Sequence, residues 1–124
     1  MKKPTKQQLI ERIAELAVEH RHAHYAVTCL REDYKGEVFR YFRVHGEPYP
    51  NRHGIDYSDP AYDGVIRATA QSYERMSQAK QHRYNVKRRL DTAVRNLMDN
   101  TGDQLKRPAP AVVKRATLSG ETLQ

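Results

Sequence analysis

The sequence has a single cysteine and no apolar stretch of membrane-spanning length. Because Cys29 is alone, an intramolecular disulfide is excluded, which fits a reducing compartment such as the cytoplasm. The first eight residues are basic and polar, and no apolar segment of the kind found in secretory signals follows them. The sequence therefore predicts a cytoplasmic protein that is not inserted in a membrane.

Sequence patterns typical of catalysis are also missing. The chain has neither the phosphate-binding pattern G-x-x-x-x-G-K-[ST] nor the dinucleotide-binding pattern G-x-G-x-x-G. The only thiol lies inside a predicted helix, where packing is the usual role, and a narrow helical shape offers no enclosed pocket. We therefore expect a protein that is not an enzyme and has no catalytic residues and no cofactor.

The chain is poor in apolar residues and rich in positive charge. Only 38% of its 124 residues are hydrophobic, and the mean hydropathy is −0.91. Because a compact core would be thin, two explanations compete: an elongated helical shape with a narrow seam, or a partly disordered chain. The heptad spacing of the apolar residues favours the elongated helical shape. The 22 Lys and Arg residues exceed the 15 Asp and Glu residues, which gives a net charge of +7. That excess fits a polyanion, an acidic protein surface or anionic lipid without deciding among them.

An apolar stripe recurs in alternating steps of four and three residues from Thr5 to Tyr34. This heptad spacing predicts one long helix packed along a seam against another helix. Thr5 and Gln8 have the spacing of a capping box, so we expect the helix to begin there. The stripe consists of Leu9, Ile13, Leu16, His20, Ala23, Val27, Leu30 and Tyr34.

Gly36 leaves two interpretations for residues 37–45. The glycine could end the helix and release a short strand rich in aromatic and β-branched residues. Alternatively, the helix continues, and Val38, Tyr41 and His45 extend the stripe after one extra step of four. A glycine inside a helix costs only about 1 kcal/mol relative to alanine, and a single short strand would have no partner. We therefore expect a continuous helix over about residues 5–45.

The second half of the chain repeats the heptad pattern after a loop. Residues 46–59 have loop composition, and Asp59-Pro60 is typical of an N-cap followed by the first helical position. A second helix is predicted over about residues 60–98, with a stop signal at Asn100-Thr101-Gly102. Its stripe consists of Val65, Thr69, Ser72, Met76, Ala79, Arg83, Val86, Leu90, Ala93 and Leu97.

Together these elements predict an all-α fold, a long antiparallel helical hairpin resembling a coiled coil. The hairpin domain spans residues 1–102, and residues 103–124 form a basic tail that contains prolines. Because two helices alone bury little surface, either the loop or a second chain is needed to cover the seam. A homodimer that completes a four-helix bundle is one prediction.

Residues 80–89 carry five formal positive charges and no acid. Lys and Arg neutralise phosphates, and an interleaved Tyr can stack on a base. The first functional hypothesis is therefore an accessory protein that binds DNA or RNA with little sequence specificity. The alternative is the solvated face of a long helix. The candidate contact residues are Lys80, Arg83, Tyr84, Lys87, Arg88 and Arg89.

Aromatic residues gather around the predicted loop. Such residues either fold over the helix ends as a small core or anchor a protein interface. The second functional hypothesis is therefore an inhibitor or adaptor that docks on a larger nucleic-acid-processing enzyme through this loop and the basic helix. The candidate partner-binding residues are Tyr41, Tyr49, His53, Tyr57 and Tyr62.

Three alternating histidines are the only hint of a metal site. On a helix, His20 and His24 lie one turn apart, but His22 points elsewhere. Zinc would need further ligands, and none stands at a suitable spacing. We therefore predict no metal site.

Overall fold

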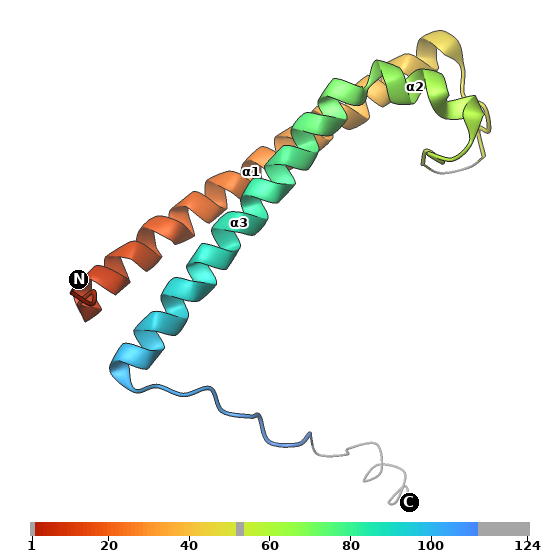
Figure 1. Cartoon of the computed structure of the whole chain (residues 1–124). Coiled ribbons are helices and arrows are strands. Elements are labelled where there is room, and N and C mark those ends of the chain that lie inside the picture. The colour runs from red at the N-terminus through yellow and green to blue at the C-terminus, as the bar shows by residue number, and fades with distance from the viewer. Residues whose placement is uncertain (1, 52–53, 112–124) are drawn as a thin grey trace, which may run out of the picture.

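The computed structural model describes residues 2–51 and 54–111. That part of the chain contains three α-helices, α1 (Lys6–His45), α2 (Asp63–Ala68) and α3 (Ala70–Thr101), and a short 3-10 helix, η1 (Pro60–Tyr62). α1 and α3 run antiparallel and pack against each other along their length, and the connecting segment closes one end of the pair (Figure 1). The prediction of an all-helical fold in which two long helices pack together is confirmed.

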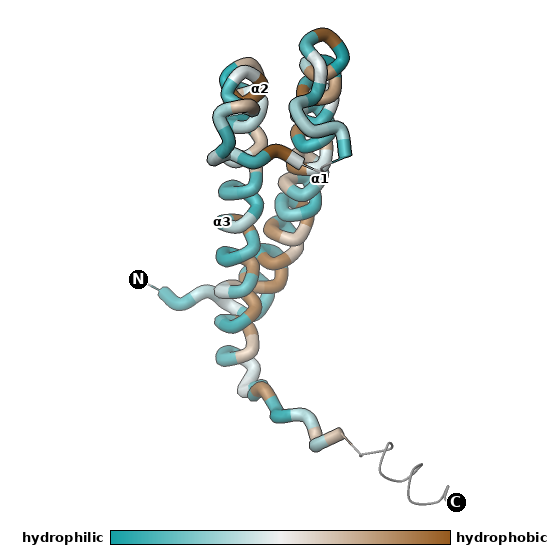
Figure 2. Tube along the Cα trace, turned by 90° about the vertical axis from the view of Figure 1, so that its right-hand side faces the viewer, coloured by the Kyte–Doolittle hydropathy of each residue, from teal (hydrophilic) through white to brown (hydrophobic). Residues whose placement is uncertain are grey.

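The seam between α1 and α3 forms the core. The stripe residues from Leu9 to Tyr34 and from Val65 to Leu97 are all buried or half-buried, whereas His45, in the extension beyond Gly36, is exposed. Leu16, Val27, Val65 and Val86 have almost no accessible surface. Figure 2 shows hydrophobic residues where the helices face each other and hydrophilic residues on their outer turns. Fully burying one side chain of this size stabilises the fold by about 1.5–3 kcal/mol. The heptad pattern therefore identifies the packed face of both helices correctly.

α1 is one continuous helix that passes through Gly36 to His45. At its start, the Thr5 hydroxyl oxygen accepts a hydrogen bond from the Gln8 backbone N–H (3.1 Å). The Gln8 side chain accepts one from the Thr5 N–H (2.9 Å), which completes the expected capping box. The helix ends at Gly46, whose φ of 84° favours glycine. Residues 37–45 are therefore helical rather than a strand.

The second helical stretch differs from the predicted single helix over residues 60–98. It is divided into η1, α2 and α3, and it continues to Thr101. The interruption lies at Thr69, whose φ of −108° and ψ of 12° depart from helical values. Its buried hydroxyl donates a hydrogen bond to the Val65 carbonyl (2.7 Å), a contact that competes with regular helical geometry. The heptad pattern could not reveal this break because Thr69 still occupies a seam position.

The ends of the second stretch follow the predicted capping residues. The Asp59 carboxylate accepts a hydrogen bond from the Ala61 N–H (2.9 Å), as expected of an N-cap. α3 stops at Gly102 in the left-handed conformation, with φ 79°. Residues 103–111 continue as an exposed segment without regular structure, and residues 112–124 of the predicted tail lie outside the described residues. Among the described helices, none is long and apolar enough to cross a membrane.

Candidate nucleic-acid and partner interfaces

The basic segment lies in the middle of α3, and part of it forms an exposed face. Lys80, Tyr84, Lys87 and Arg88 are all exposed to solvent, and 57% of Tyr84 is accessible. The Arg88 guanidinium carbon lies 5.8 Å from the centre of the Tyr84 ring, a cation–π contact. Lys87 pairs with Asp91 one turn further along (Nζ–Oδ1 3.4 Å). We call these four residues, from Lys80 to Arg88, the basic face.

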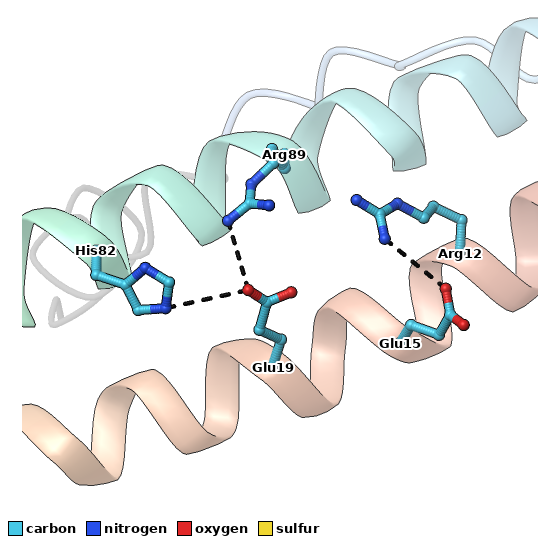
Figure 3. Close-up of polar contacts among 5 residues, drawn as sticks. All are labelled: Arg12, Glu15, Glu19, His82 and Arg89. Carbon is cyan, nitrogen blue, oxygen red and sulfur yellow. Dashed lines mark hydrogen bonds and ion pairs between the residues drawn. The ribbon is translucent and has the colours of Figure 1, made fainter.

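The other two cations of the segment contact α1 instead. Arg83 is half-buried, and its Nη1 lies 3.2 Å from Nδ1 of His24. Arg89 reaches Glu19 (Nη2–Oε2 3.4 Å), and His82 Nε2 approaches the same carboxylate at 4.0 Å (Figure 3). Two of the six predicted nucleic-acid contacts therefore join the helices to each other.

The charged groups that join α1 and α3 are only partly balanced. Two acids of α1 contact polar or cationic partners on α3: Glu19 lies against Arg89, and the buried Ser72 hydroxyl donates a hydrogen bond to Glu37. Arg83, in contrast, faces a histidine rather than an acid. Lys80 forms no ion pair with any residue in the described part of the chain. Within the described residues, Lys87 is thus the only cation of the basic face that pairs with an acid, and Lys80 and Arg88 add positive charge without an acidic partner there.

At the closed end of the pair, aromatic rings form a small core. Tyr62 is only 2% exposed, and its ring lies 6.4 Å from Phe42 and 6.1 Å from Tyr49, measured between ring centres. Tyr41 is half-buried with its hydroxyl against Gly64, and its ring lies 4.3 Å from His45. Two of the predicted partner-binding tyrosines, Tyr41 and Tyr62, thus pack inside this closed end, which we call the tip.

Two further predicted partner-binding residues, Tyr57 and Tyr49, are accessible. Tyr57 is 54% exposed, and its hydroxyl lies 2.7 Å from that of Tyr34, which joins the loop to α1. Tyr73 packs against both rings, with centres 5.5 Å from Tyr34 and 5.8 Å from Tyr57. Tyr49 is also exposed, whereas His53 lies outside the described residues.

An apolar groove of about 360 Å³ lies between α1 and the loop. Phe39 is one of the residues that line it, and 62% of the Phe39 surface is exposed. Sequence reasoning missed this groove because only the folded loop brings residues 54–57 against α1. Its lining consists of Tyr34, Lys35, Val38, Phe39, Phe42, Gly54, Ile55 and Tyr57. We call it the tip groove.

A larger hollow of about 520 Å³ lies between α1 and α3 toward their other ends. Its lining combines three apolar side chains with three arginines and three neutral polar side chains. No acidic residue is among those that line it. The hollow is lined by Leu9, Arg12, Leu16, Asn85, Arg88, Arg89, Thr92, Ala93 and Asn96. We call it the arginine hollow.

The structure gives no sign of a metal centre: no group of three or more His, Cys, Asp or Glu residues within the described ranges could hold an ion. Comparison with known proteins adds no relative, since no family model, curated protein or solved structure matches the chain.

Burial and the hydrogen bond to Tyr57 raise the pKa of Tyr34 well above its ordinary value of 10. The folded protein then retains a proton that the unfolded chain releases. The stabilisation is complete below pH 10 and is lost as pH rises further, through the folded pKa. In a spectrophotometric titration, we expect the latest tyrosine ionisation to coincide with alkaline unfolding, and Tyr34→Phe should remove it.

Tyr25→Phe is the matched control for this titration. Contact with the Cys29 thiol also raises the pKa of Tyr25, but the Tyr25 side chain stands in solvent. Its removal should leave the late ionisation in place. If the late ionisation persists in Tyr34→Phe, the assignment to the Tyr34–Tyr57 contact is incorrect.

Proposed function

We propose that the protein is a non-enzymatic accessory protein that binds nucleic acid through the basic face of α3. The observation that supports this most directly is the exposed set Lys80, Tyr84, Lys87 and Arg88, in which the Arg88 guanidinium lies over the Tyr84 ring. Cations of this kind neutralise backbone phosphates, and an exposed ring can stack on an unpaired base. Phosphate contacts and stacking on a base are independent of sequence, so binding is expected to show little sequence specificity.

The test is fluorescence anisotropy with a labelled 20-nucleotide single strand and the corresponding duplex. If Lys80, Lys87 and Arg88 each neutralise one phosphate, the logarithm of the affinity should fall linearly as the logarithm of the salt concentration rises. The expected slope is about −2 for the single strand and about −2.7 for the duplex. The double charge reversal Lys87→Glu/Arg88→Glu should weaken binding about 100-fold at low salt.

The matched control is Arg40→Glu/Arg75→Glu, which changes the net charge equally at exposed positions off the basic face. We expect this variant to retain most of the affinity. Equal losses in the two double variants would show that only total charge matters, and binding that does not depend on salt would contradict the proposal.

A second function, docking on a partner protein as an inhibitor or adaptor, is favoured by the tip groove. Phe39 and Tyr57 expose large apolar rings beside it, as anchors of protein interfaces do. If this is the main activity, Phe39→Ala should release the partner while the basic-face double reversal leaves it bound. The opposite pattern supports the nucleic-acid function.

A further inference from the structure

The arginine hollow lies outside the basic face but adjoins it through Arg88. Arg12 extends from α1 and Arg89 from α3, and Figure 3 shows both side chains reaching into the space between the two helices. Arginine is well suited to phosphate because its planar guanidinium offers five N–H donors in a fixed fork. Two helices that are remote in sequence thus place guanidinium groups around one hollow.

The remaining lining residues match the other parts of a nucleotide. Asn85, Asn96 and Thr92 supply neutral donors and acceptors that can bond a base edge or a sugar hydroxyl. Leu9 and Ala93 add apolar surface to its lining. A volume of about 520 Å³ falls within the range of small-ligand pockets.

Two of the three arginines of the hollow, Arg12 and Arg89, already have carboxylate neighbours, but these contacts are long and exposed. Arg12 lies 3.7 Å from Glu15 and Arg89 lies 3.4 Å from Glu19, and each contact uses one guanidinium nitrogen. The Arg12, Glu15, Arg89 and Glu19 side chains are all about 40–70% exposed. Exposed pairs of this kind contribute about 0–1 kcal/mol, so exchanging or sharing them with a phosphate costs little.

We propose that the arginine hollow binds a nucleoside phosphate unit, with its phosphate between Arg12 and Arg89 and its base or sugar against Leu9 and the two asparagines. The unit is either a free nucleotide or one link of a nucleic-acid strand. In the second case the proposal rests on the proposed function, since the strand continues from the basic face through Arg88 into the hollow.

The test uses Arg12→Gln, because Arg12 is on α1 and takes no part in the basic face. AMP and the 20-nucleotide strand are titrated separately into the 15N-labelled full chain, and amide shifts of residues 9–16 and 85–96 are followed by NMR. We expect at least one of the two probes to shift these signals. Arg12→Gln should weaken that binding about tenfold. Arg21→Gln, an exposed arginine on α1 that does not line the hollow, should leave it unchanged.

The outcomes separate the two sources and the two proposals. AMP binding that depends on Arg12 supports a free nucleotide, even if the strand does not bind. Strand binding that depends on both Arg12 and the basic face supports a nucleic-acid link. Strand binding that needs Lys87 and Arg88 but ignores Arg12→Gln overturns the hollow while the proposed function stands. Failure of both probes to shift signals of the hollow also overturns it.

Discussion

Replacing Leu16 with alanine is expected to lower the free energy of unfolding by about 3 kcal/mol. Leu16 is 1% exposed and forms the main cluster of the seam with Val86 and Ala93. Truncation removes the transfer free energy of the lost carbons and leaves a cavity that two long, regular helices can only partly close. In a fold with so narrow a core, this loss should lower the Tm by more than about 10 °C.

Urea unfolding followed by circular dichroism measures this effect. Val18→Ala is the control, since Val18 is on the same helix but is 58% exposed. Its free energy of unfolding should change by less than about 0.5 kcal/mol. A small effect at Leu16 would mean that the helices do not pack along the seam in solution as they do here, and it would contradict the fold.

Alanine at the two helical glycines should change stability in opposite directions. At Gly36, in α1, an added Cβ would meet nothing closer than the flexible Arg40 guanidinium at 3.4 Å. Because alanine is a far better helix former than glycine, Gly36→Ala should stabilise the fold by about 1 kcal/mol. At Gly64, in α2, the Cβ would overlap the Tyr41 hydroxyl. Gly64→Ala should therefore destabilise the fold by about 1–3 kcal/mol.

Tyr41→Phe provides an internal check on the cause. Without the hydroxyl, the nearest ring carbon still lies 3.2 Å from the added Cβ, so the strain should be relieved only in part. A double-mutant cycle between Tyr41→Phe and Gly64→Ala should show a coupling free energy of at least about 0.5 kcal/mol. If Gly64→Ala proves as stabilising as Gly36→Ala, the close contact between α2 and α1 is absent in solution.

The periodicity of the sequence predicted what depends on helical spacing alone. Leu16 and Val86 were assigned to the seam because a heptad places them on one face, and both are buried. The same reasoning preferred a helix through Gly36, since one glycine costs little when the residues on both sides pack. The break at Thr69 escaped prediction because a hydroxyl that bonds to the carbonyl four residues earlier leaves no mark on the apolar pattern.

The candidate sites were only partly predictable for a related reason. Spacing correctly placed Lys80, Tyr84 and Arg88 on one side of α3, because that depends on α3 alone. The contacts of Arg83 and Arg89 depend on which residues of α1 lie opposite, here His24 and Glu19, and the pattern of α3 alone does not contain that information. Lys35 and Phe39 line one groove with Tyr57 because the folded loop lies against α1, which the sequence pattern does not predict.

The register of the helix pair also indicates an order of folding. Contacts across the seam join residues ever further apart in sequence from the tip outward. The separation is 35 residues for Glu37–Ser72, 59 for His24–Arg83 and 70 for Glu19–Arg89. The entropic cost of closing a loop rises with its length. We therefore expect α1 and α3 to pair first at the tip and then progressively toward the opposite end, which should be the first to fray. The arginine hollow lies toward that fraying end. A ligand bound there by both helices would hold them together where they separate most easily, and it would raise the apparent stability of the whole chain.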